Sequence, residues 1–213
     1  MKNKIKCESK SWDEMRECCE KLGKEIINSN YKPDIIIAIA RGGLTPAMNL
    51  SDILGIKDLL SIQIEHWGKT AKKDARAVLK YPVEIDLSEK NVLIVDDIAD
   101  TGESLEVAYE SIKKLNPEEI KVAAIHYVKT SKFKPDFYAE TVDRTHEFIW
   151  IVYPWNFIED TINLIKKLDI SHSYSDINEI NEIKKELEDN YKFSVDKKTL
   201  KKVILEMERR SKK

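Results

Sequence analysis

Apolar residues follow two alternating patterns through most of the chain. Short runs rich in β-branched residues, such as 35–39 and 91–95, are typical of parallel strands buried on both faces. Between them, apolar residues recur at every third or fourth position, the spacing of one helix face. The pattern predicts strands at 35–39, 59–64, 91–95, 120–128, 137–139 and 148–152, and helices at 11–28, 45–54, 105–115 and 156–168. Strands that alternate with helices predict an α/β fold with a mostly parallel sheet, flanked by helices, that binds ligands at its carboxyl edge.

The stretch 65–81 fits neither pattern. It is basic, with Lys69, Lys72, Lys73 and Arg76, and it is longer than most loops within a compact domain. Loops of this length are usually functional lids or disordered segments, so the stretch is a candidate lid, with a solvated charged loop as the simpler alternative.

The composition changes again after residue 169. Helical spacing predicts two helices, at about 175–190 and 196–210, so we expect a core domain at 1–169 and a helical C-terminal extension at 170–213. From Lys192 onward the tail has nine basic and three acidic residues. Either the tail docks on the core or on a dimer partner, or its charge binds nucleic acid.

Charge and hydropathy exclude some classes of protein. The 213 residues include 36 Lys and Arg against 38 Asp and Glu, and the net charge of -2 argues against a protein that coats nucleic acid. The longest apolar run, 35–40, is far short of the roughly 20 residues that span a bilayer. No charged-then-apolar leader opens the chain, so we expect a cytoplasmic protein without a membrane segment.

Candidate chemistry follows the strand at 91–95. Asp96 and Asp97 come at the end of this strand, where we expect them to face solvent and accept hydrogen bonds from vicinal hydroxyls. The next residues, 100–104, form a turn whose backbone N–H groups and hydroxyls open a helix, and such a turn can bind phosphate. Gly102 would let a ligand approach the backbone closely. The alternative is an ordinary turn in which Asp100 or Thr101 caps the helix.

The whole stretch 92–104 resembles the phosphoribosyl pyrophosphate (PRPP) motif of type I phosphoribosyltransferases. Four apolar residues, two acids and two apolar residues precede Asp-Thr-Gly-x-Ser, although Ala99 is small for its position. The resemblance implies a Rossmann-like sheet, in which Asp96 and Asp97 bind the ribose hydroxyls and Mg²⁺ and Asp100 takes a proton from the purine. It implies a site for the 5′-phosphate made by Asp100, Thr101, Gly102, Glu103 and Ser104.

The resemblance extends to two further segments. Residues Ala40, Arg41 and Gly42 follow the first predicted strand, where the family binds pyrophosphate and where the peptide bond to Arg41 is cis in the family. The basic stretch 65–81 takes the position of the family's catalytic lid.

Base recognition resembles that of the 6-oxopurine branch. Lys129 follows an apolar strand, and a lysine is a donor suited to the exocyclic oxygen of the purine. In the segment 150–155 the resemblance implies that Trp150 stacks on the base and that the backbone of Ile151 meets its edge, whereas core packing is the alternative for both tryptophans. Asn156 stands where that branch commonly has an acid, so Glu159 or Asp160 would have to replace it.

Together these motifs predict a Mg²⁺-dependent enzyme that transfers the phosphoribosyl group of PRPP to a purine base in nucleotide salvage, releasing pyrophosphate. Hypoxanthine, guanine and xanthine are the expected bases, and a homodimer or higher homo-oligomer is the expected assembly. Two alternatives stay open: a PRPP sensor whose basic tail binds nucleic acid, and a phosphoribosyltransferase for another acceptor.

Overall fold

The computed structural model describes residues 5–67, 76–168 and 177–211 and separates the chain into two compact units. The sheet unit is Asp13–Arg144, and the terminal unit is Met1–Trp12 with Thr145–Lys213. The boundary therefore lies near residue 144, whereas the sequence places it near 169.

A six-stranded sheet forms the sheet unit. Its strands run in the order β4-β3-β2-β5-β6-β7, and every neighbouring pair is parallel except β3 with β4. The elements are α1 (Trp12–Asn28), β2 (Ile35–Ala40), α2 (Leu44–Leu54), β3 (Leu59–Trp67), β4 (Arg76–Tyr81), β5 (Asn91–Ala99), α3 (Glu103–Lys113), β6 (Glu119–Val128) and β7 (Phe137–Val142). The predicted α/β class and mostly parallel sheet are confirmed.

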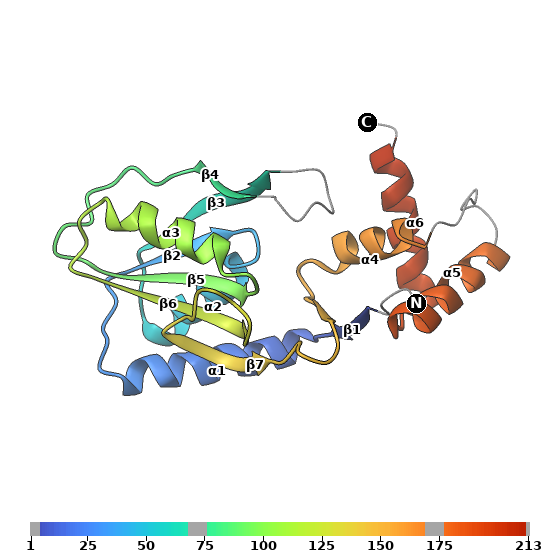
Figure 1. The fold of residues 1–213 in the computed structure, drawn as a ribbon, viewed down its shortest axis with the longest axis horizontal. Helices are drawn as coiled ribbons and strands as arrows, with labels where there is room; N and C mark the ends of the chain where they lie inside the picture. The colour runs from blue at the N-terminus through green and yellow to red at the C-terminus, as the bar shows by residue number, and fades with distance from the viewer. Residues whose placement is uncertain (1–4, 68–75, 169–176, 212–213) are drawn as a thin grey trace. The chain divides into compact units, whose positions relative to one another are not determined.

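The apolar runs place β2 and β5 at the centre of this sheet. Ile35, Ile37 and Ile39 of β2 pack in one core with Leu105 and Ile112 of α3. The intervening residues of β2 point to the opposite face, because successive side chains of a strand alternate. Both strands are therefore covered on both sides, and Figure 1 shows α3 on one side of the sheet and α1 on the other.

The connections reverse direction between β2 and β5. After β2 the chain passes through α2 to β3 on one side, whereas after β5 it passes through α3 to β6 on the other side. Because such crossovers are right-handed, α2 and α3 cover opposite faces of the sheet. The loops after β2 and β5 therefore lead to opposite faces, and ligands of sheets of this kind bind between such loops, at the carboxyl edge.

The stretch 65–81 is only partly a loop. β3 continues to Trp67, and β4 begins at Arg76 and pairs with it antiparallel. The predicted loop is therefore wrong for 65–67 and 76–81. Half-buried and exposed residues alternate along 77–80, but this alternation is too short to distinguish from a charged loop. Residues 68–75 of the candidate lid lie outside the described residues.

The terminal unit has its own core. β1 (Lys6–Ser9) pairs parallel with β8 (Ile149–Val152), and α4 (Phe157–Lys166), α5 (Ile177–Tyr191) and α6 (Lys197–Ser211) share one set of buried apolar side chains. Phe193, between the last two helices, is 1% exposed and its ring lies 5.8 Å from that of Phe157.

This shared core explains the shifted boundary. Val152 of β8 and Ile162 of α4 are buried with Leu187 of α5 and Ile204 of α6. Residues 145–168, which the sequence assigns to the core domain, therefore belong with the two tail helices, both of which are present. Within the described part of the chain, no helix has the length and apolarity needed to cross a bilayer.

Candidate functional site

At the carboxyl edge the loop after β2 lies against the end of β5. A Cβ atom at Gly42 would lie 2.3 Å from Oδ2 of Asp97, and one at Gly43 would lie 2.3 Å from the backbone oxygen of Val95. Only glycine fits so close an approach. The Ala40–Arg41 peptide bond is cis, as the family resemblance implies. The segment predicted to bind pyrophosphate thus lies directly beside the predicted acid pair.

The acid pair is buried, which corrects an expectation from the sequence. β5 continues through Ala99, so Asp96 and Asp97 lie within the strand and are 8% and 7% exposed rather than facing solvent. Oδ1 of Asp96 accepts a hydrogen bond of 2.9 Å from the amide of Asp97. Burial, and then the negative charge of Asp97, raises the pKa of Asp96 well above its usual value.

Two adjacent buried carboxylates are suited to a cation, because a cation would offset both the desolvation and their mutual repulsion. Among the residues that the structure describes, no group of three or more His, Cys, Asp or Glu side chains could hold a metal by itself. Mg²⁺ commonly takes one or two carboxylates and completes its shell with water and substrate phosphates. Asp96 and Asp97 therefore fit the Mg²⁺ that the family resemblance implies.

The turn at 100–104 leads directly into α3. Gly102 has φ of 89° and precedes the helix, and the amide of Glu103 donates to Oγ1 of Thr101 at 3.3 Å. Thr101 is exposed and Ser104 is half-buried, so the first turn of α3 faces the carboxyl edge. Helix N-termini of this kind attract phosphate through their amides and the helix dipole.

The side chain of Asp100 does not cap the helix. Its Oδ1 lies 2.6 Å from Nη1 of Arg144, and the Arg144 side chain is only 9% exposed. Sequence reasoning missed Arg144, because it stands between two strands without a pattern and lies 44 residues from its partner. Only the adjacency of β5, β6 and β7 in the sheet brings the two residues together.

The predicted base-binding residues are divided between the two units. Lys129 directly follows β6 in the sheet unit, and its Nζ donates to Oδ2 of Asp143 at 2.8 Å. Trp150 and Ile151 lie in β8 of the terminal unit. There Ile151 is buried and Trp150 is half-buried against the core, with Nζ of Lys167 5.0 Å from its ring centroid. Their contact with a purine stays a prediction.

Of the three polar residues that follow, one has a clear structural role. Oε2 of Glu159 lies 2.5 Å from Nη1 of Arg210 on α6, within the terminal unit. Asn156 is the residue that precedes α4, and Asp160 lies in its first turn. The ion pair of Glu159 ties α4 to α6, which assigns part of the tail's basic charge to packing within this unit.

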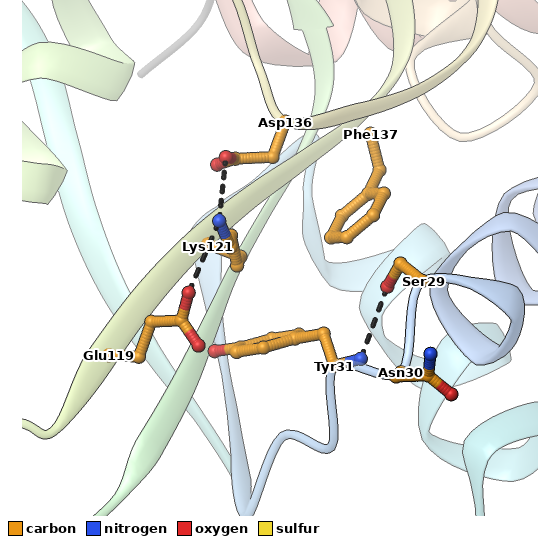
Figure 2. Close-up of a pocket in the computed structure, with 7 residues that line it drawn as sticks. All are labelled: Ser29, Asn30, Tyr31, Glu119, Lys121, Asp136 and Phe137. Carbon is orange, nitrogen blue, oxygen red and sulfur yellow. Dashed lines mark hydrogen bonds and ion pairs between the residues drawn. The ribbon is translucent and has the colours of Figure 1, made fainter.

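A separate cavity opens at the amino edge of the sheet. Figure 2 shows its seven lining residues, and its volume is about 350 Å³. Lys121 pairs with Glu119 at 3.2 Å and with Asp136 at 3.5 Å, and the hydroxyl of Tyr31 donates to the backbone of Val92. Because these polar groups satisfy one another and no predicted site residue lines the cavity, its contacts serve to hold the strands together.

Comparisons with known proteins agree with this geometry. A model of the phosphoribosyl transferase domain matches residues 10–160. The chain is 30% identical to the hypoxanthine-guanine phosphoribosyltransferase of Schizosaccharomyces pombe over 182 residues, which covers 68% of this chain and 86% of that protein. It is also 30% identical over 149 residues to the xanthine-guanine phosphoribosyltransferase of Idiomarina loihiensis, covering 68% and 84%.

Solved structures extend the comparison. A purine phosphoribosyltransferase from Pyrococcus horikoshii superposes with a TM-score of 0.60 at 38% identity, covering 71% of this chain and 94% of that one. A hypothetical protein from Neisseria gonorrhoeae with bound ppGpp has a TM-score of 0.59 at 26% identity, covering 86% and 96%.

Proposed function

The chain belongs to the phosphoribosyl transferase family, and on that premise we propose that it transfers the 5-phosphoribosyl group of PRPP to a purine base in nucleotide salvage. Hypoxanthine, guanine and xanthine are the proposed bases, and pyrophosphate is the second product. The observation that carries the proposal is the carboxyl edge of the sheet, where the glycine loop after β2 lies against the buried Asp97 and the chain after β5 turns into the N-terminus of α3. The Neisseria gonorrhoeae neighbour supports it, because ppGpp also joins a guanine to a ribose and to pyrophosphate groups.

Each segment at the carboxyl edge has a role in this reaction. The residues after β5 bind the 5′-phosphate through the first turn of α3: Asp100, Thr101, Gly102, Glu103 and Ser104. The loop of Ala40, Arg41 and Gly42 binds the pyrophosphate. Asp96 and Asp97 bind the ribose hydroxyls and would hold Mg²⁺, which when bound neutralises the pyrophosphate leaving group. The proposed assembly is a homodimer or higher homo-oligomer.

The acceptor base completes the reaction. As the bond between C1′ and pyrophosphate breaks, the ring nitrogen of the purine bonds to C1′ and its proton passes to the Asp100 carboxylate. Fixed charges around C1′ stabilise the oxocarbenium-like transition state. Lys129 donates to the exocyclic oxygen of the base.

A panel of nucleobases tests the function. We expect pyrophosphate release from PRPP and Mg²⁺ with hypoxanthine, guanine or xanthine, and none with adenine or a pyrimidine, because a lysine donor suits a carbonyl acceptor. Mass spectrometry of the nucleotide product identifies the base used. Turnover with adenine or a pyrimidine alone would show another acceptor, and PRPP binding without turnover on any base would favour the sensor.

Lys129→Ala tests the choice of base. We expect kcat/KM for the 6-oxopurines to fall by about 10-fold, since a single hydrogen bond to a substrate oxygen is lost. The KM for PRPP should stay unchanged, because Lys129 is proposed to contact the base and is not among the residues proposed to bind the phosphate or the ribose. Asp143→Asn, which removes the ion-pair partner of Lys129 but keeps the lysine, is the matched control. An unchanged preference among bases would remove Lys129 from the base site.

A further inference from the structure

Asp100 pairs with an arginine whose side chain is far more buried than its own. The Arg144 side chain is 9% exposed, whereas that of Asp100 is 51% exposed. Burying a guanidinium is costly unless its contacts offset that cost, and a partly exposed ion pair contributes little stability by itself. The arginine nevertheless brings Nη1 to 2.6 Å from Oδ1 of the one carboxylate to which the proposed reaction gives a proton.

The elements hold this arginine in a fixed place. Arg144 follows the end of β7, and Asp100 follows the end of β5, with β6 between the two strands. The guanidinium binds the carboxylate through one nitrogen, Nη1 to Oδ1, and its rigid plane limits where that nitrogen can lie. Oδ1 of Asp100 faces the arginine, and Oδ2 is the oxygen left for a substrate.

Without the arginine, Asp100 would have a competing partner nearby. An aspartate just before a helix tends to hydrogen-bond to the amides of the first turn. In this chain those amides belong to the proposed 5′-phosphate site at Glu103 and Ser104. An Asp100 turned toward them would place negative charge where the phosphate binds and would withdraw the carboxylate from the purine.

We propose that Arg144 is the positioning residue for the general base: it holds the Asp100 carboxylate through Oδ1, away from the α3 N-terminus, and directs Oδ2 at the purine. The inference rests on the proposed transferase function. In the step itself, the proton on the purine ring nitrogen passes to Oδ2, and the nitrogen electron pair forms the bond to C1′. The electron pair of the broken C1′–O bond leaves with pyrophosphate.

A double-mutant cycle tests this coupling. Arg144→Met should lower kcat by about 10- to 100-fold, because a misplaced catalytic group costs this much, and it should raise the KM for PRPP, because the released carboxylate competes with the 5′-phosphate for the amides at the α3 N-terminus. In an Asp100→Asn background the same substitution should lower kcat by less than about twofold, because residues that act as one unit are not additive. Arg144→Lys, which keeps the charge without the fork, should give an intermediate kcat.

A control variant and three possible results decide whether Arg144 positions Asp100. Arg16→Met, which breaks the exposed ion pair with Glu20 on α1, is the control and should retain wild-type kcat. An unchanged kcat for Arg144→Met, or an equal loss in both backgrounds, would overturn the positioning role. If Arg144→Met does not fold, the same cycle with Arg144→Lys gives the answer. A wild-type protein without turnover on any base would instead overturn the proposed function, and the positioning role with it.

Discussion

Asp100→Asn should lower kcat by about 100- to 1,000-fold with a folded protein and nearly unchanged PRPP binding. The substitution removes the group that takes the purine proton, and general-base catalysis by one side chain typically contributes this much. The geometry should survive, because the asparagine oxygen can still accept the hydrogen bond that Nη1 of Arg144 donates to Oδ1 in the wild type. Single-turnover assays with saturating PRPP and purine measure the loss directly.

The control for this substitution is Asp86→Asn. Asp86 is an exposed aspartate whose Oδ1 accepts a hydrogen bond from the amide of Ser88, and it lies in the segment before β5, at the amino end of that strand. We expect wild-type kcat for this variant. Equal losses in kcat and in PRPP affinity for Asp100→Asn would mean that the carboxylate binds the ground state and has no role as a base.

The central strands were predictable because strands that are buried on both faces consist mainly of apolar residues. β2 and β5 lie between other strands and under helices, so β2 is apolar throughout and β5 is apolar from Val92 to Val95. β1 and β4 were missed, since an edge strand or a two-stranded ladder buries few side chains and carries little pattern. The end of β5 was misplaced because a charged residue usually ends a buried strand, and here Asp96 and Asp97 continue it.

The candidate site also contains residues that local sequence predicts and residues that only the fold brings together. The segments 40–42 and 100–104 are contiguous, so their local chemistry can be interpreted before the fold is known. The pairing of Arg144 with Asp100 requires β5, β6 and β7 to be neighbours in the sheet. The assignment of Trp150 to the terminal unit requires β8 to pair with β1. Such long-range relations leave no periodic signal in one sequence.

Gly102→Ala should weaken PRPP binding by about 100-fold, because small displacements of a binding loop cost this much. Gly102 has φ of 89°, and a Cβ there would lie 2.5 Å from the amide nitrogen of Phe133 and 2.8 Å from Oγ of Ser131. The amide of Lys132 also donates to the backbone oxygen of Thr101. The loop at 131–133 thus packs directly against the proposed phosphate-binding turn, and an added methyl group must push the two segments apart.

Gly55→Ala separates this clash from backbone strain. Gly55 also has positive φ, at 70°, but a Cβ there meets nothing within 4 Å. It should lose only about 1 kcal/mol of stability, the cost of a left-handed alanine, and bind PRPP normally. Gly102→Ala should lose the same amount plus about 1–3 kcal/mol for the overpacked contact. Thermal unfolding and calorimetric titration with PRPP compare the two variants. If Gly102→Ala matched Gly55→Ala in both measurements, the turn would not be shaped by its contact with residues 131–133, and the proposed phosphate site would lose the feature that fixes its geometry.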